Sequence, residues 1–162
     1  MSIEKIYELL NTVKDPEIPV ISICELGIVR NVAINGDFIT INITPTYSGC
    51  PAMAEISHDI IKTLKNAGYL NVEITTIFSP AWTTDWMSQE AKEKLRDYGI
   101  APPHKTLETE KLFIIMQPVE KVNCPFCNSI NTKRTSEFGS TACKALYYCN
   151  KCCQPFEFFK GI

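Results

Sequence analysis

Apolar residues recur at helical spacing in two stretches of the chain. The first stripe predicts an amphipathic helix over residues 2–14, and its members are Ile3, Ile6, Leu9, Leu10 and Val13. Residues 15–19, Asp-Pro-Glu-Ile-Pro, end this helix, because proline cannot continue it and the residue before a proline avoids helical backbone angles. The second stripe predicts a helix that starts at Pro51 and stops at Gly68, with an apolar face of Met53, Ile56, Ile60 and Leu64.

Alternation of apolar and polar residues predicts strands. Residues 28–34 and 38–43 alternate on either side of Asn35-Gly36-Asp37, and Asn-Gly between two such runs is a strong hairpin signal. Further strands are expected at residues 72–78 and 111–116, with a helix at residues 89–98 that Asp85 or Ser88 would cap. This order predicts an α+β fold over residues 1–118, a small sandwich with helices on one face of a mixed sheet.

The last part of the chain differs from the rest in its cysteine content. Six of the eight cysteines lie in the last 39 residues. Two C-x-x-C pairs offer the four thiolates that suit a tetrahedral divalent ion, most often zinc, and they are Cys124, Cys127, Cys149 and Cys152. Four protein ligands leave no open position, so the metal would be structural and would supply the folding energy of a zinc ribbon over residues 119–162. Iron in the same thiolate site is the main alternative.

A single cysteine lies between the second predicted strand and the second predicted helix. Residues 44–50 read Thr-Pro-Thr-Tyr-Ser-Gly-Cys, and Pro51 as the first helical residue would make Cys50 the N-cap. Four free amides and the positive end of the helix dipole would then lower the thiol pKa and favour the thiolate, the form that binds metal. The alternative is a small apolar side chain packed at a strand–helix corner.

Composition and charge narrow the function classes. With 162 residues, 45% hydrophobic and 21% charged, the chain is typical of a globular protein. It has no apolar run long enough to span a membrane and no signal-peptide pattern at its start, so we expect a cytoplasmic protein without membrane contact. Residues 1–118 carry 10 Lys or Arg against 15 Asp or Glu, and residues 119–162 carry 6 against 3. This net charge of +3 is a small footprint for nucleic-acid binding, which we do not expect.

Several motifs carry a family resemblance. Residues 15–19, 26–29 (Leu-Gly-Ile-Val) and 44–51 resemble the small iron–sulfur assembly domain family that includes SufT. One departure is Glu25, where that family usually has Asp. The rest of the chain resembles one branch of the family, the phenylacetate-degradation PaaD proteins, which end in a zinc ribbon. The matching stretches are residues 80–86 (Pro-Ala-Trp-Thr-Thr-Asp-Trp), 98–103 (Tyr-Gly-Ile-Ala-Pro-Pro), 138–145 (Phe-Gly-Ser-Thr-Ala-Cys-Lys-Ala) and 155–156.

The resemblance implies a non-catalytic accessory protein of the multicomponent ring-1,2-phenylacetyl-CoA epoxidase in aerobic phenylacetate degradation. Such a protein would help to mature metal centres, with the iron–sulfur reductase of that system and the general iron–sulfur assembly machinery as partners. The residues agree, because the chain carries neither the Glu and Glu-x-x-His set of a di-iron oxygenase nor a dinucleotide fingerprint. The alternative is a non-catalytic structural subunit of the epoxidase that docks through its zinc ribbon.

Within this hypothesis Cys50 would hold an iron–sulfur cluster or iron transiently. One thiolate is too few for a stable cluster, which usually takes four cysteine ligands. The remaining ligands would come from Asp15 and Glu17, from a partner protein, or from a second copy of the chain in a homodimer. We expect at least one of the two tryptophans to flank the site, and the supporting loop residues would be Thr46, Ser48, Trp82, Thr84 and Asp85.

Overall fold

The computed structural model describes residues 2–103 and 121–160. Its contacts divide the chain into two compact units, residues 1–91 and residues 92–162, and each unit is described separately. Within the described ranges, no helix is both long enough and apolar enough to cross a membrane.

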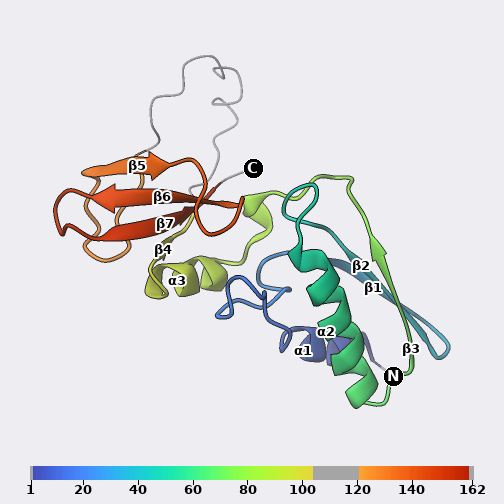
Figure 1. Ribbon diagram of the computed structural model, residues 1–162. Helices are drawn as coiled ribbons and strands as arrows, with labels where there is room; N and C mark the ends of the chain where they lie inside the picture. Colours follow the sequence, from blue (N-terminus) through green and yellow to red (C-terminus); the bar gives the residue numbers. More distant parts are fainter. Residues whose placement is uncertain (1, 104–120, 161–162) are drawn as a thin grey trace. The chain divides into compact units, whose positions relative to one another are not determined.

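The described part of the first unit is built from two α-helices, one short 3-10 helix and three strands (Figure 1). The strand order is β1-β2-β3, with β1 and β2 antiparallel and β2 and β3 parallel. A parallel pair needs a crossover between its strands, and α2 supplies it. The elements are α1 (Ile3–Leu10), β1 (Val29–Asn35), β2 (Phe38–Ile43), α2 (Ala52–Asn66), β3 (Asn71–Thr76) and the short helix η1 (Thr84–Trp86).

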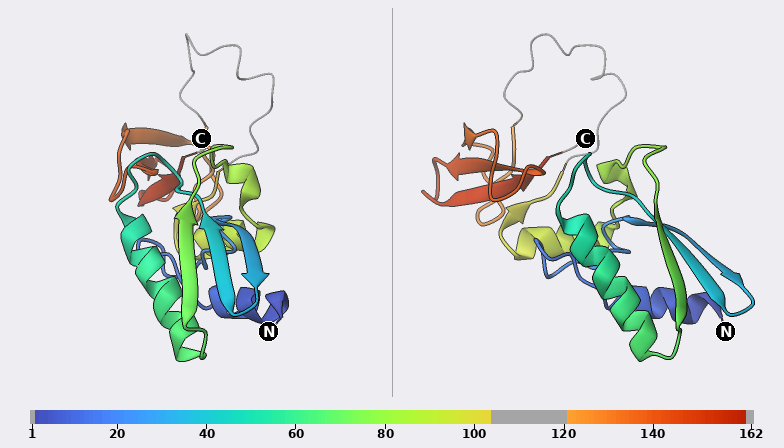
Figure 2. Two further views of the ribbon diagram at one scale, coloured as in Figure 1. Left: turned by 90° about the vertical axis from the view of Figure 1, so that its right-hand side faces the viewer. Right: turned by 45° about the vertical axis from the view of Figure 1, so that its right-hand side comes forward.

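The core of this unit lies between the sheet and the helices. In β2 the side chains of Ile39, Ile41 and Ile43 are fully buried, whereas Thr40 and Asn42 on the opposite face are half-buried. Helix α1 packs against β1 and α2, and α2 runs beside β3 (Figure 2). The buried stripe of α2 consists of Ala52, Ile56, Ile60 and Leu64. The predicted sandwich of helices on a mixed sheet is therefore confirmed.

The first helix is shorter than predicted. It ends at Leu10, with Asn11 as its C-cap, rather than at residue 14. The Thr12 hydroxyl donates a hydrogen bond to the Leu9 carbonyl oxygen (2.7 Å), which closes the last turn with a side chain instead of a further helical residue. Val13 nevertheless remains buried, so it contributes to the core from an extended segment that bridges back through Lys14 to Ser22.

The turn that follows explains how Glu25 is accommodated. The Ser22 amide donates to Oε2 of Glu25 (2.8 Å), and the Glu25 amide donates to Oγ of Ser22 (3.1 Å). This reciprocal pair is the arrangement of a capping box, in which two side chains satisfy each other's backbone donors. Glu25 therefore stabilises the turn at residues 22–25, directly before the Leu-Gly-Ile-Val segment.

The second unit holds most of helix α3 (Gln89–Asp97) and a four-stranded sheet. The Ser88 hydroxyl accepts a hydrogen bond from the Ala91 amide (3.0 Å), so Ser88 rather than Asp85 caps α3. The strand order is β4-β7-β6-β5, and the strands are β4 (Ile100–Ala101), β5 (Thr132–Ser136), β6 (Lys144–Cys149) and β7 (Pro155–Phe159).

Strand β4 pairs in parallel with β7, which places Ile100 and Ala101 in the ribbon sheet. Sequence reasoning did not foresee this pairing, because two residues are too short for a period-two signal. The strand predicted at residues 111–116 and the domain boundary predicted at 118/119 lie outside the described residues. The core of the ribbon consists of Ala101, Val122, Cys124, Ala145, Tyr147, Cys149, Phe156 and Phe158.

Candidate functional site

The loop that leads to Cys50 is partly buried at its start and exposed at its tip. It leaves β2 at Ile43, and the Thr44 amide donates to the Ile28 carbonyl oxygen (3.0 Å). Thr44, Pro45 and Thr46 are buried, Ser48 and Gly49 are exposed, and Cys50 is half-buried. Oγ1 of Thr44 is buried without a hydrogen-bond partner among the described residues. An orphaned buried hydroxyl costs about 1–3 kcal/mol, so this strand end is a place where the fold tolerates a local cost.

Cys50 is not the N-cap of α2. The helix begins at Ala52, and the N-cap is Pro51, which already has helical backbone angles. The Met53 amide reaches the Cys50 carbonyl oxygen (3.4 Å), a three-residue bond that forms a tight turn instead of a regular first helical turn. The sequence prediction was wrong by one residue at this position.

The predicted lowering of the Cys50 pKa is also wrong. Burial raises the pKa of the Cys50 thiol, and the negative charges of Glu17 and Asp15 raise it further. Hydrogen bonds to the sulfur from the Ala52 amide and the Thr46 side chain oppose this effect without overcoming it. The prediction considered the helix amides and left out desolvation and the acidic turn that folds against the thiol.

The two carboxylates of the Asp-Pro-Glu turn have different surroundings. Asp15 is only 6% exposed, and its Oδ1 accepts hydrogen bonds from the Glu17 amide (2.9 Å) and the Ile18 amide (2.8 Å). Asp15 therefore holds the turn in shape. Glu17 is half-buried, and both carboxylates act on the Cys50 sulfur through their charge. The structure thus brings Asp15, Glu17, Thr46 and Cys50 into one electrostatic neighbourhood.

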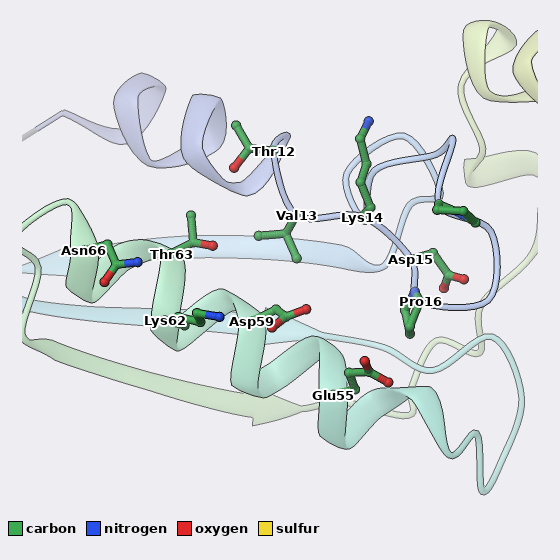
Figure 3. A pocket seen from close by; sticks show the side chains of 11 residues that line it. Thr12, Val13, Lys14, Asp15, Pro16, Glu55, Asp59, Lys62, Thr63 and Asn66 are labelled. Atoms are coloured by element: carbon green, nitrogen blue, oxygen red, sulfur yellow. The ribbon is translucent and has the colours of Figure 1, made fainter.

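A groove of about 360 Å³ adjoins this neighbourhood. One wall is formed by residues between 12 and 19, and the other is the outer side of α2. Figure 3 shows Asp15 and Pro16 on the first wall, across from Glu55 and Asp59 on the second. Asp15 belongs both to this groove and to the surroundings of Cys50, and the groove follows α2 from Glu55 to Asn66.

Residues 80–86, which contain both tryptophans and are called the aromatic loop below, contact the Leu-Gly-Ile-Val segment at residues 26–29. Trp82 is 2% exposed, and its Nε1 donates to the Leu26 carbonyl oxygen (3.0 Å). The guanidinium of Arg30 lies over the Trp86 ring, 3.4 Å from its centroid, and a Cβ at Gly27 would meet Cβ of Trp86 at 2.8 Å. Trp82 is therefore a core residue, and the hypothesis that an indole flanks Cys50 stays a prediction.

The remaining supporting residues differ in burial. Thr84 is buried at 1% exposure in η1, whereas Asp85 and Ser48 are exposed. Among the supporting residues that the sequence singled out, Thr46 contributes a side-chain hydrogen bond that acts to lower the pKa of the Cys50 thiol. Sequence reasoning missed Glu55 and Asp59, because acidic residues on the outer side of a helix carry no distinctive signal.

The four cysteines of the two C-x-x-C pairs converge in the ribbon. Their sulfur atoms all lie within 4.8 Å of one another, with 3.6 Å between Cys124 and Cys152 and 3.6 Å between Cys127 and Cys149. A tetrahedron with metal–sulfur bonds of about 2.3 Å has sulfur–sulfur edges of about 3.8 Å. The set therefore fits a tetrahedral metal ion, held by Cys124, Cys127, Cys149 and Cys152.

Backbone amides favour the thiolate form in both pairs. The amides of Cys152 and Lys151 donate to the Cys149 sulfur, and this lowers the pKa of Cys149 to about 6. Burial raises the pKa of Cys124, and the amides of Cys127 and Phe126 oppose that effect in the same i+2, i+3 pattern. Each C-x-x-C pair and its turn, called a knuckle below, therefore has amide donors placed to stabilise the negative charge of a metal-binding thiolate.

The other cysteines differ in surroundings. Burial raises the pKa of Cys24 to about 12, and the charge of Glu25 adds to this effect. The buried sulfur of Cys143 lies 3.0 Å from Oγ1 of Thr141. Cys153 is exposed at the second knuckle, in a left-handed conformation with φ of 59°.

Comparison with known families divides the chain into two matches. Residues 3–76 match the family described as iron–sulfur cluster assembly protein, and residues 110–160 match the PaaD zinc beta ribbon domain. A protein of Escherichia coli named as part of a putative 1,2-phenylacetyl-CoA epoxidase is 46% identical over 165 residues, which cover 99% of this chain and 93% of that protein. An Fe-S protein maturation auxiliary factor of Porphyromonas gingivalis is 40% identical over 94 residues, which cover 57% of this chain and 89% of that protein.

Two solved structures resemble the first part of the chain. A domain of unknown function (DUF59) from Bacillus anthracis has a TM-score of 0.53 and 33% identity, covering 57% of this chain and 89% of the other. A conserved hypothetical protein from Thermotoga maritima has a TM-score of 0.51 and 30% identity, covering 59% and 94%. These similarities agree with the α+β fold described above.

Proposed function

Because the chain belongs to the PaaD family, in which an iron–sulfur assembly domain precedes a zinc ribbon, we propose that it is a maturation factor of a multicomponent ring-1,2-phenylacetyl-CoA epoxidase. In this role it assists iron–sulfur cluster or iron assembly in aerobic phenylacetate degradation and catalyses no step of the oxidation. Its partners are the other epoxidase components, above all the iron–sulfur reductase, and the general iron–sulfur assembly machinery. The relatives named as maturation factors support this proposal through the first domain.

The observation that carries the proposal is the acidic surrounding of Cys50. A neutral thiol next to two carboxylates is a poor nucleophile, but the same negative charge favours a metal cation that displaces the thiol proton. Sulfur and carboxylate oxygen from Cys50, Asp15 and Glu17 are too few ligands for a permanent cluster. An incomplete ligand set suits a carrier, because a carrier has to release its cargo.

The ribbon has a different role in this proposal. Its four cysteines would hold zinc, which supplies folding energy to a small domain and leaves no open coordination position. Iron would fit the same thiolate set. The metal therefore organises the second unit, and the transfer chemistry belongs to the first.

A second candidate is a structural subunit that docks into the epoxidase through the ribbon, with Cys50 merely packed. The observation in its favour is the name of the relative that matches nearly the whole chain, a putative epoxidase component. Under this alternative, loss of the Cys50 sulfur leaves every metal centre of the system intact.

The deciding experiment compares Cys50→Ala and wild type in cells. We expect Cys50→Ala to leave the protein folded and its ribbon metal in place, because one small side chain replaces another at a half-buried position. The reductase component isolated from these cells should be poor in iron–sulfur cluster, measured as iron and acid-labile sulfide per chain. His58→Ala, at an exposed position of α2, is a control for expression. Equal cluster content in mutant and wild type would show that Cys50 is a packing residue.

A further inference from the structure

The stretch of residues 138–145 has no part in the chemistry above, yet the fold holds it firmly. Lys144 is 3% exposed, and its Nζ pairs with Oε2 of Glu157 (3.1 Å). Oε1 of Glu157 accepts a hydrogen bond from the Ser140 amide (2.8 Å), and a Cβ at Gly139 would lie 2.8 Å from the same oxygen. Gly139, Ser140 and Lys144 therefore fit one carboxylate, which fixes the loop against the sheet.

This arrangement leaves apolar side chains exposed on one face of the ribbon. In β6, alternate residues face the core (Ala145, Tyr147 and Cys149), and the other set faces outward. On the outward face the loop covers Lys144, but Leu146 is 38% exposed. Phe138 is 61% exposed. Its amide donates a hydrogen bond to Oγ of Ser136, and the Ser136 hydroxyl donates to the Phe138 carbonyl oxygen. Ser136 is the partner of Leu146 in the β5–β6 pairing, so Phe138 is tied to the strand residue beside Leu146.

Cations border these side chains. Nζ of Lys160 lies 4.4 Å from the centroid of the Phe138 ring, and Nζ of Lys133 lies 5.4 Å from that of the Tyr148 ring. Glu137 is shared between Arg134 (2.6 Å) and Lys160 (3.9 Å), so it neutralises only one of them. Residues 121–160 hold six Lys or Arg against two Glu, which gives this stretch a net charge of +4.

We propose that the outward face formed by Phe138, Leu146 and Tyr148, bordered by Lys133 and Lys160, is a docking surface for an acidic segment of a partner protein that carries an apolar anchor. Exposed aromatic and aliphatic side chains supply the contact area, and the lysines supply orientation and faster association with carboxylates. The Lys144–Glu157 pair is a positioning element, because it holds Phe138 outward before the partner arrives and so lowers the ordering cost of binding.

The test uses the full-length protein and the purified components of the epoxidase system, each alone, so its choice of probe rests on the proposed function. We expect one component to bind wild type and the variant carrying Phe138→Ser and Leu146→Ser to bind about tenfold more weakly or worse. Ile130→Ser is the matched control, since Ile130 is as exposed as Phe138 (61%) but lies in the loop that follows the Cys124–Cys127 pair, outside the proposed surface. The double change Lys133→Glu and Lys160→Glu should slow association and remove its salt dependence.

A second variant tests the positioning role. Lys144→Met removes the buried pair but none of the exposed side chains, so weaker binding with the ribbon metal still present would support pre-arrangement of the loop. Binding that is unchanged in the Phe138 and Leu146 variant, or reduced equally by Ile130→Ser, would overturn the proposal. Capture of duplex DNA or of a second copy of the chain on this face would overturn it as well. Cys50→Ala should bind normally, so failure of the transfer mechanism and failure of this surface are separable.

Discussion

Replacement of Gly27 by alanine tests the contact that anchors the aromatic loop. Gly27 has a φ of +76°, where alanine costs about 1–2 kcal/mol relative to glycine. The added Cβ would also lie 2.8 Å from both Cβ and the carbonyl oxygen of Trp86. Trp86 is held in place by the stacked guanidinium of Arg30, so relief of this overlap requires a shift that costs about a further 1–3 kcal/mol. The expected loss of unfolding free energy is about 2–5 kcal/mol.

Gly36→Ala is the matched control, because Gly36 has a φ of +60° and no atom within 4 Å of an added Cβ. It should lose only the conformational part, about 1–2 kcal/mol. Urea unfolding followed by tryptophan fluorescence reports on residues 1–91, because both tryptophans of the chain lie there. Equal losses for Gly27→Ala and Gly36→Ala would refute the reasoning, since they would show that the approach of Gly27 to Trp86 has no energetic weight.

Two further outcomes follow from the cysteines. Cys127→Ser should release the ribbon metal and make the second unit sensitive to protease, because metal binding and folding are coupled there. Cys50→Ala should retain one metal per chain in elemental analysis. A metal-free Cys127→Ser protein whose ribbon still resists protease would contradict this coupling. Because the pKa of Cys50 is raised, its alkylation by iodoacetamide at pH 8 should be slower in the native protein than in urea and should rise with pH beyond the range of an ordinary thiol. Glu17→Gln removes a negative charge that raises this pKa, so Cys50 should be alkylated faster in the native variant than in the native wild type. The rate is measured by mass spectrometry of the Cys50 peptide, and an unchanged rate would contradict the prediction.

The sequence by itself determined the elements that depend on local pattern. Alternation around Asn35-Gly36 placed the β1–β2 hairpin. The apolar stripe placed Ile56, Ile60 and Leu64 on the buried face of α2, but the buried residue of its first turn is Ala52 and not the predicted Met53. The two C-x-x-C pairs identified the four cysteines that the fold brings together, because ligand spacing is itself a local property. The hairpin, the helical stripe and each single C-x-x-C pair are strong signals, since each is decided by residues within a few positions of one another, whereas the meeting of the two pairs joins residues 22 or more positions apart.

Tertiary structure decided what depends on distant neighbours. The sequence analysis predicted a lowered pKa for the Cys50 thiol from the adjacent helix alone. Burial and the carboxylates of Glu17 and Asp15, more than 30 positions away along the chain, raise this pKa instead. Likewise only the tertiary structure shows that the Trp82 indole nitrogen donates to the Leu26 carbonyl oxygen, 56 positions away along the chain. Desolvation and charge act through space, and a sequence records neither the distance between two segments nor the water excluded between them.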